Sequence, residues 1–278
     1  MSQLERSIDY YQTRVLMIEE SIRLIKTDSG KHTGKVLGLW MMPLLIRGTE
    51  IAKEAYFFMR HIDDVVDRDL LVENPLSYVE EIRKDVFDDN QNQKYPIEKL
   101  AFRSLKVLNQ RKKNDDNPKQ DFLNGIDVAI RDYKRAENKE ILTADELSNY
   151  YIESFDPHFN IMLTAVGSNL RSRDVETFSY CQYFAYGVQD FETDWQRGLI
   201  NIPKETLKLS GLTVQNKPDE VKSNSIIKEW VDFESHKNRV DLGNFLEGIN
   251  DLPSEKSAQL LLNSLSKRVI RILEEPSF

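Results

Sequence analysis

The chain has 278 residues, of which 46 are acidic and 38 are basic, so its formal net charge at pH 7 is −8. This acidic balance argues against a nucleic-acid partner, because nucleic-acid binding normally needs a basic face. The single cysteine excludes an intrachain disulfide. Together with a polar N-terminal sequence unlike a signal peptide, it predicts a reducing, cytoplasmic location.

Helical periodicity dominates the chain, and the alternation typical of strands is nearly absent. The apolar run at residues 36–46 is too short to span a bilayer, so it predicts at most peripheral contact with a membrane surface. No linker divides the sequence, and we expect residues 1–278 to form one all-α domain, a helical bundle around a central cavity. In chain order, the pattern predicts helices over Gln3–Lys26, Lys35–Leu45, Gly48–Val66, Pro75–Asp89, Ile97–Leu108, Lys119–Arg135, Ala144–Asn169, Arg173–Gln196, Pro218–Leu246 and Glu255–Glu274.

An acidic motif, Asp63-Asp64-Val65-Val66-Asp67, lies at the end of the third predicted helix. Asp63 and Asp67 are four residues apart, so on a helix they share one face, a single turn apart. Such a pair alone is most often a solvated helix face. Here the apolar run Ala55–Met59 precedes it, which a solvent-facing patch would not need. This flank favours an acidic patch at the wall of a cavity.

A second motif, Asp190-Phe191-Glu192-Thr193-Asp194, repeats the spacing near the end of the eighth predicted helix. Burying two facing carboxylate pairs would be costly without cations to neutralise them. Oxygen ligands without a Cys/His cluster favour Mg²⁺, which takes one or two carboxylates and completes its shell with water and substrate phosphate. Together the motifs predict a Mg²⁺–diphosphate site lined by two facing helices.

The segment Tyr56–Asp67 resembles the first aspartate-rich motif of the squalene/phytoene synthase family. Asp190–Asp194, followed by Arg197–Pro203, is similar to the second motif of that family and the segment after it. Motif order, separation and helical content agree over roughly residues 34–203. The resemblance implies an isoprenoid-synthase fold. It also implies Mg²⁺-dependent ionisation of an allylic prenyl diphosphate, C15 or C20, followed by carbon–carbon bond formation.

The resemblance carries site roles onto individual positions. Asp63, Asp67, Asp190 and Asp194 match the metal-ligand aspartates. Arg60 would contact the diphosphate, with an i,i+4 ion pair to Asp64 as the alternative. The apolar wall would include aromatic side chains, for which ordinary core packing is the alternative. Tyr151 lies near a family tyrosine that faces the cavity and is a candidate catalytic residue. Besides Arg60, the positions expected to bind the substrate are Lys35, Tyr56, Phe57, Phe159, Gln189 and Arg197.

The chain also departs from the family pattern. Gln and Asn usually stand seven and four residues before the second motif, and Arg stands directly before it, whereas this chain has Tyr183, Tyr186 and Gln189. The usual Asn is a metal ligand, so we expect one cation to be absent or differently held. The serines that normally flank Lys35 are missing as well.

A small-residue helix segment of the family, Ala-Gly-Thr-Val-Gly, is replaced by Asp156-Pro157-His158-Phe159-Asn160. Pro157 is expected to kink the helix, and Phe159 to fill space that a second prenyl chain would otherwise occupy. His158 is a candidate general base or acceptor contact. A structural hydrogen bond is the alternative for that histidine.

The family default is head-to-head joining of two prenyl diphosphates into a phytoene- or dehydrosqualene-like product. An aromatic small-molecule acceptor is the runner-up, because the aspartates are retained while the wall is altered. A terpene cyclase also fits the same residues. A non-catalytic scaffold would not need both carboxylate pairs.

Overall fold

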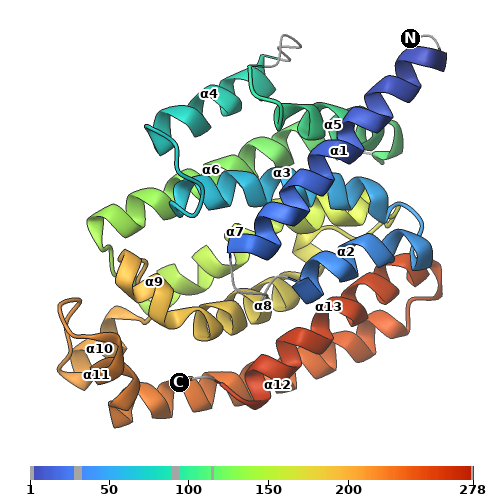
Figure 1. Ribbon diagram of the computed structural model, residues 1–278. Helices are drawn as coiled ribbons and strands as arrows, with labels where there is room; N and C mark the ends of the chain where they lie inside the picture. The colour runs from blue at the N-terminus through green and yellow to red at the C-terminus, as the bar shows by residue number, and fades with distance from the viewer. Residues whose placement is uncertain (1–2, 28–32, 89–93, 114–115, 277) are drawn as a thin grey trace. The chain divides into compact units, whose positions relative to one another are not determined.

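The computed structural model describes residues 3–27, 33–88, 94–113, 116–276 and 278, with the backbone alone for residues 3–9, 27 and 33–35. Thirteen α-helices, α1 to α13, form nearly all the regular structure of these residues (Figure 1). The described residues contain no strand, only one isolated parallel bridge between Ile141 and Ile200. The all-α prediction is therefore confirmed.

Residue contacts divide the chain into two compact units. Unit 1 comprises Met1–Ile130 and Asn160–Asn169, and unit 2 comprises Arg131–Phe159 and Leu170–Phe278. The chain passes between them three times, within α6 (Pro118–Asn138), within α7 (Ala144–Ala165) and directly after Asn169. The arrangement of one single domain around a central cavity stays a prediction.

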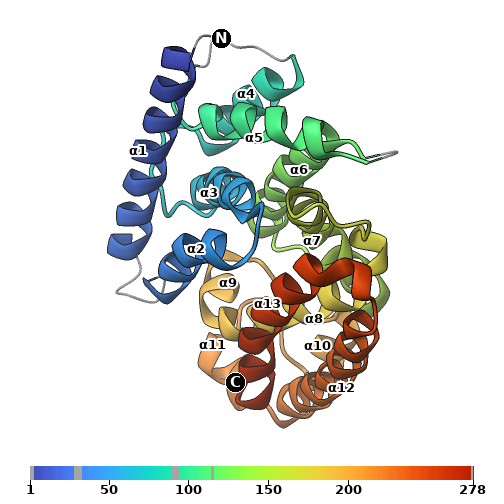
Figure 2. The same ribbon diagram turned by 90° about the vertical axis from the view of Figure 1, so that its right-hand side faces the viewer.

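In unit 1, α3 occupies the middle, and α1, α2, α4 and α5 pack around it (Figure 2). Its side chains are buried on almost every face, and Phe57 and Phe58 are completely buried. Burial of such a side chain contributes about 2–3 kcal/mol, so α3 is the core helix of this unit. The bounds of these five helices are α1 (Gln3–Thr27), α2 (Thr33–Leu45), α3 (Thr49–Val66), α4 (Pro75–Phe87) and α5 (Glu98–Arg111).

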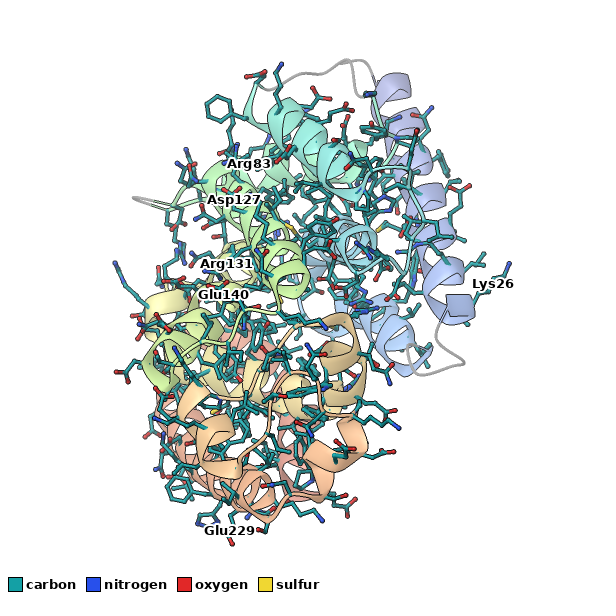
Figure 3. All side chains as sticks on the ribbon, turned by 90° about the vertical axis from the view of Figure 1, so that its left-hand side faces the viewer. Lys26, Arg83, Asp127, Arg131, Glu140 and Glu229 are labelled. Carbon is teal, nitrogen blue, oxygen red and sulfur yellow. The ribbon has the colours of Figure 1, made fainter. Side chains whose placement is uncertain are left out.

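An exposed ion pair joins two helices on the surface of unit 1. Arg83 of α4 donates from Nη2 to Oδ2 of Asp127 in α6 at 2.8 Å (Figure 3). Both side chains are more than a third exposed, so the pair adds about 1 kcal/mol at most. Burial around α3, rather than surface charge, holds this unit together.

In unit 2, α8 packs against α9, α12 and α13. The long helices α12 and α13 run antiparallel to each other (Figure 1). The helix bounds are α8 (Glu176–Gln189), α9 (Phe191–Arg197), α10 (Lys204–Ser210), α11 (Pro218–Ser223), α12 (Ser225–Asn250) and α13 (Lys256–Glu274).

The structure corrects several predicted helix boundaries. The predicted helix Arg173–Gln196 is two helices, α8 and α9, which meet at Asp190. The predicted helix Pro218–Leu246 is likewise divided, because the Asn224 side chain accepts hydrogen bonds from the backbone of Ile226 and Ile227 and so caps a new helix, α12. Helix α10 was not predicted.

Two positions show how local residues shape α7 and α9. Pro157 lies inside α7, which remains one helix across it. Gly198 ends α9 at a φ of 93°, and a Cβ at this position would overlap the carbonyl oxygen of Ala136. Only glycine meets both conditions without strain. Among the described residues, no helix is long and apolar enough to cross a membrane.

Candidate active site

The first aspartate motif lies at the C-terminal end of α3, in unit 1. The backbone N–H of Asp67 donates to the carbonyl oxygen of Asp63 at 2.8 Å, so the two residues are one helical turn apart. The Asp63 side chain is 43% exposed, whereas that of Asp64 is only 1% exposed. Asp63 is therefore accessible to a ligand, and Asp64 points into the protein.

Asp64 forms buried ion pairs with two arginines. Its Oδ2 lies 2.5 Å from Arg23 Nη2, and its Oδ1 lies 2.5 Å from Arg60 Nη2. The Arg23 guanidinium also binds Glu20 of α1 at 2.7 Å. These contacts tie α1 to the end of α3 that carries the motif.

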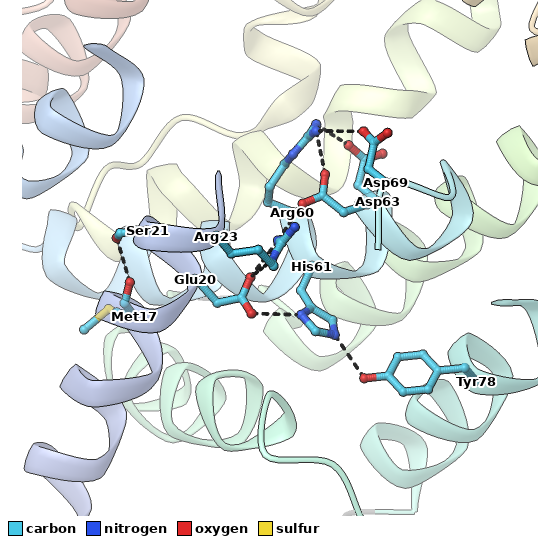
Figure 4. A network of polar contacts seen from close by, with 10 residues as sticks. Met17, Glu20, Ser21, Arg23, Arg60, His61, Asp63, Asp69 and Tyr78 are labelled. Atoms are coloured by element: carbon cyan, nitrogen blue, oxygen red, sulfur yellow. Dashed lines mark hydrogen bonds and ion pairs between the residues drawn. The ribbon is translucent and has the colours of Figure 1, made fainter. Parts of the chain in front are cut away.

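A chain of hydrogen bonds extends this network to α4 (Figure 4). Glu20 Oε1 lies 3.1 Å from His61 Nδ1, and His61 Nε2 lies 3.0 Å from the Tyr78 hydroxyl. Sequence reasoning missed Glu20 and Arg23. Their position in the sequence could have revealed them. Both charged residues lie near the apolar stripe of α1 that buries Met17 and Leu24, so their side chains lie close to the core.

Arg60 is engaged by acidic side chains on its own helix and the following turn. Its Nη1 lies 2.7 Å from Asp63 Oδ2, and its Nη2 lies 3.9 Å from Asp69 Oδ2 (Figure 4). With the Asp64 pair, the expected i,i+4 alternative is confirmed. The diphosphate contact of Arg60 stays a prediction.

The second aspartate motif lies where α8 meets α9, in unit 2. The Asp194 N–H donates to the Asp190 carbonyl oxygen at 3.0 Å, so these residues are also one turn apart. A side-chain amide binds each carboxylate. Gln189 Nε2 donates to Asp190 Oδ1 at 2.9 Å, and Asn201 Nδ2 donates to Asp194 Oδ2 at 3.3 Å. These amides orient the carboxylates without neutralising them.

The segment that carries Asn201 is anchored by two buried side chains. Arg135 Nη2 donates to the Ile200 carbonyl oxygen at 2.9 Å, and the Tyr151 hydroxyl donates to the Asn201 carbonyl oxygen at 3.0 Å. Burial raises the pKa of Tyr151 well above its ordinary value, so the hydroxyl keeps its proton. Sequence reasoning named Tyr151 but missed Asn201, which lies seven residues after Asp194.

Aromatic side chains of α7 and α8 pack together in unit 2. Tyr151 stacks on Tyr183 with ring centroids 4.7 Å apart, and Phe155 meets Tyr183 edge-on at 5.7 Å. Phe155 also stacks on Tyr186 at 6.5 Å. Tyr183 and Tyr186, which replace polar residues of the family pattern, thus belong to a largely apolar cluster.

The altered segment of α7 has clear structural contacts. His158 Nδ1 lies 3.2 Å from the Ser154 carbonyl oxygen, which confirms the structural hydrogen bond and leaves its role as a base a prediction. Phe159 is completely buried and meets Phe178 edge-on at 5.3 Å, as the core-packing alternative expects. Burial, then the charges of Glu176 and Glu153, raise the pKa of Asp156 to about 6.

The remaining predicted residues lie in varied surroundings. Tyr56 is partly exposed and meets the fully buried Phe57 edge-on at 5.8 Å. Arg197 is the last residue of α9. Lys35 lies in α2, but its side chain is outside the described residues. Substrate contacts at these positions stay predictions.

The donor set suits Mg²⁺ that arrives with a phosphate ligand. Each motif offers two carboxylates one turn apart, and Mg²⁺ typically takes one or two carboxylates while water and phosphate complete its shell. The described residues contain no group of three or more acidic, histidine or cysteine side chains that could hold a metal on its own. The residues therefore fit a metal shared with substrate, not a closed protein cage.

Comparison with known proteins places the chain in a family. A family model described as squalene/phytoene synthase matches residues 52–277, which include both aspartate motifs. The chain belongs to the squalene/phytoene synthase family. It is thus a prenyl-transferring enzyme of isoprenoid biosynthesis, as the resemblance implied.

A solved structure supports the isoprenoid-synthase fold. The chain is similar to the squalene synthase HpnC from Alicyclobacillus acidocaldarius, with a TM-score of 0.69 and 17% sequence identity. The match covers 98% of this chain and 94% of that chain. No curated protein sequence matches the chain.

Proposed function

We propose that this enzyme ionises an allylic prenyl diphosphate, C15 or C20, and joins the resulting cation head-to-head to a second prenyl diphosphate. Asp63 and Asp67 would hold Mg²⁺ at one motif, and Asp190 and Asp194 at the other. The observation that carries the proposal is the repeated pair of partly exposed carboxylates, one helical turn apart in both motifs. Mg²⁺ would neutralise the negative charge that develops on the leaving diphosphate.

The chain's own residues would support each step. The bond between the allylic carbon and the diphosphate oxygen breaks, and its electron pair leaves with diphosphate. The π electrons of the second substrate then form the new carbon–carbon bond. Two prenyl diphosphates give one hydrocarbon, two diphosphates and two protons when no reductant takes part.

Apolar and aromatic side chains would protect the cation from water, which would otherwise capture it as an alcohol. Tyr151 keeps its proton at neutral pH because burial raises its pKa. It therefore acts as a neutral hydrogen-bond donor, not as a base. Its hydroxyl holds the segment whose Asn201 binds Asp194.

An aromatic acceptor is the second candidate function. Asp156 and His158 place two titratable groups in α7 where small residues are the family norm, and the pKa of Asp156 is raised to about 6. A group that titrates near neutral pH is suited to accept the ring proton that leaves when a prenyl group is attached. A terpene cyclase would use the same ionisation step with one substrate.

Product analysis separates these functions. The purified enzyme is incubated with C10, C15 or C20 prenyl diphosphate, with Mg²⁺ or with EDTA, and diphosphate release and product masses are measured. Release that requires Mg²⁺, with a symmetric C30 or C40 hydrocarbon, supports the proposal. A cyclised C15 or C20 product, or a prenylated aromatic formed only after addition of cell extract, would replace it with the corresponding alternative. No release from any substrate would contradict all three enzymatic functions, because each begins with ionisation of a prenyl diphosphate.

A further inference from the structure

Arg268 of α13 reaches the second aspartate motif through one amide. Its Nη2 donates to Gln189 Oε1 at 3.0 Å, and Gln189 Nε2 donates to Asp190 Oδ1 at 2.9 Å. The same guanidinium lies 5.5 Å from the centre of the Tyr186 ring. A positive charge from a helix far along the chain is therefore held next to a predicted metal-ligand carboxylate.

The amide keeps the guanidinium and the carboxylate apart. Arg268 forms no ion pair with a carboxylate in the part of the chain that the structure describes. Arg60, at the other motif, has its guanidinium in direct ion pairs with Asp63 and Asp64. The paired carboxylates offset the charge of Arg60, whereas no directly bound carboxylate offsets the charge of Arg268 among the described residues.

Arg268 contacts two of the three residues that depart from the family pattern before this motif. Gln189 stands where an arginine is usual, and Tyr186 stands where an asparagine metal ligand is usual. The guanidinium of Arg268 binds the first and lies over the second. One arginine from α13 thus brings positive charge to a motif that has lost an arginine and a metal ligand.

We propose that Arg268 binds the diphosphate group of the substrate at the second aspartate motif. This inference rests on the proposed ionisation of a prenyl diphosphate. A guanidinium presents planar, paired N–H donors that match two phosphate oxygens, and it stays charged at any working pH. Gln189 hydrogen-bonds to both partners, and it would orient Asp190 as a ligand for Mg²⁺ and Arg268 as a donor to the phosphate.

The test measures binding of inorganic pyrophosphate in the presence of Mg²⁺ by titration calorimetry, with turnover of prenyl diphosphate measured separately. Arg268→Gln is compared with Arg271→Gln, a matched control on an exposed position of the same helix. A third protein combines Arg268→Gln with Gln189→Arg, which moves the charge onto α8. Melting temperatures of all proteins are recorded.

We expect Arg268→Gln to weaken Mg²⁺–pyrophosphate binding by about 10- to 100-fold, the usual effect of losing charge-assisted hydrogen bonds. Arg271→Gln should bind like the unmodified enzyme, and the relocated arginine should restore most of the lost affinity. A merely structural Arg268 would lower the melting temperature and would not be rescued by Gln189→Arg.

Three outcomes would overturn the inference: unchanged binding in Arg268→Gln, an equal loss in Arg271→Gln, or no binding of Mg²⁺–pyrophosphate by the unmodified enzyme. Failure of the proposed function looks different. In that case the unmodified enzyme binds Mg²⁺–pyrophosphate in an Arg268-dependent way but releases no diphosphate from any prenyl substrate. The inference would then stand without the proposed reaction.

Discussion

Asp63 and Asp64 are adjacent and chemically identical, yet the structure predicts opposite effects of the same substitution. Asp64 is 1% exposed and pairs with the guanidinium groups of both Arg23 and Arg60. Asp64→Asn removes the carboxylate charge, so the two largely buried guanidinium groups lose the anion that they share. Breaking a buried ion pair in this way typically costs about 3–5 kcal/mol.

The lower end of that range applies here, because the arginine side chains retain 19% and 22% exposure and water can partly solvate them. We therefore expect a loss of about 3 kcal/mol in the free energy of unfolding. The unfolding entropy of a 278-residue chain is about 0.6 kcal/mol per kelvin. The melting temperature of Asp64→Asn should accordingly fall by about 5 °C.

Asp63→Asn should behave in the opposite way. Its carboxylate is 43% exposed and its partner Arg60 keeps the pair with Asp64, so stability should change by less than about 1 kcal/mol. Turnover should fall by more than about 100-fold, because a metal-ligand carboxylate is lost. Differential scanning calorimetry and diphosphate release measure the two effects on the matched pair. Equal melting temperatures, or full activity in Asp63→Asn, would refute the division of labour between these residues.

Three further outcomes follow from the geometry. A prenyl diphosphate analogue should raise the melting temperature only with Mg²⁺, since metal and ligand bind as one unit; an equal rise in EDTA would mean that basic residues suffice. Burial raises the pKa of Asp156 from 3.8 to about 6, so its ionisation disfavours the folded state, and the stability present at low pH is lost as pH rises through that interval. Asp156→Asn should therefore raise the melting temperature at about pH 8 and leave it unchanged below about pH 4; the same shift at both pH values would exclude the titration. Gly198→Ala should destabilise the enzyme by more than about 1 kcal/mol in denaturant titration, because its φ of 93° and the Ala136 carbonyl oxygen both exclude a Cβ.

Much of the fold and the location of the two motifs could be predicted from local patterns. The 3.6-residue periodicity located α1, α3 and α7 to within a few residues, because an amphipathic or apolar helix carries its signal in neighbouring side chains. The break at Asp190 was missed because the chain stays helical on both sides of it. The Asp190 N–H still donates to the last turn of α8, and the Asp190 carbonyl oxygen already accepts from the first turn of α9. Helix α10 was missed because a seven-residue helix holds too few turns to show a period.

The site residues also fall into two groups, those that a local pattern reveals and those that it does not. The four aspartates are recognisable because their i,i+4 spacing is local and their types favour Mg²⁺. Arg23, Asn201 and Arg268 were missed, although each binds a motif residue or its amide. Arg268 lies 79 positions from its partner Gln189 along the chain, and no periodicity links residues so far apart.

The amino-acid sequence alone was enough to specify an acidic net charge, the helices and the two aspartate pairs. The helices and the aspartate pairs depend only on residues within a few turns of one another. Packing decided which acid of the first motif is buried with arginines and which is exposed, although Asp63 and Asp64 have the same side chain. It also decided that Phe159 belongs to the core and that α13 supplies a positive charge to the second motif. Burial and ion pairing depend on helices that meet only after the chain has folded, and for that reason no local pattern encodes them.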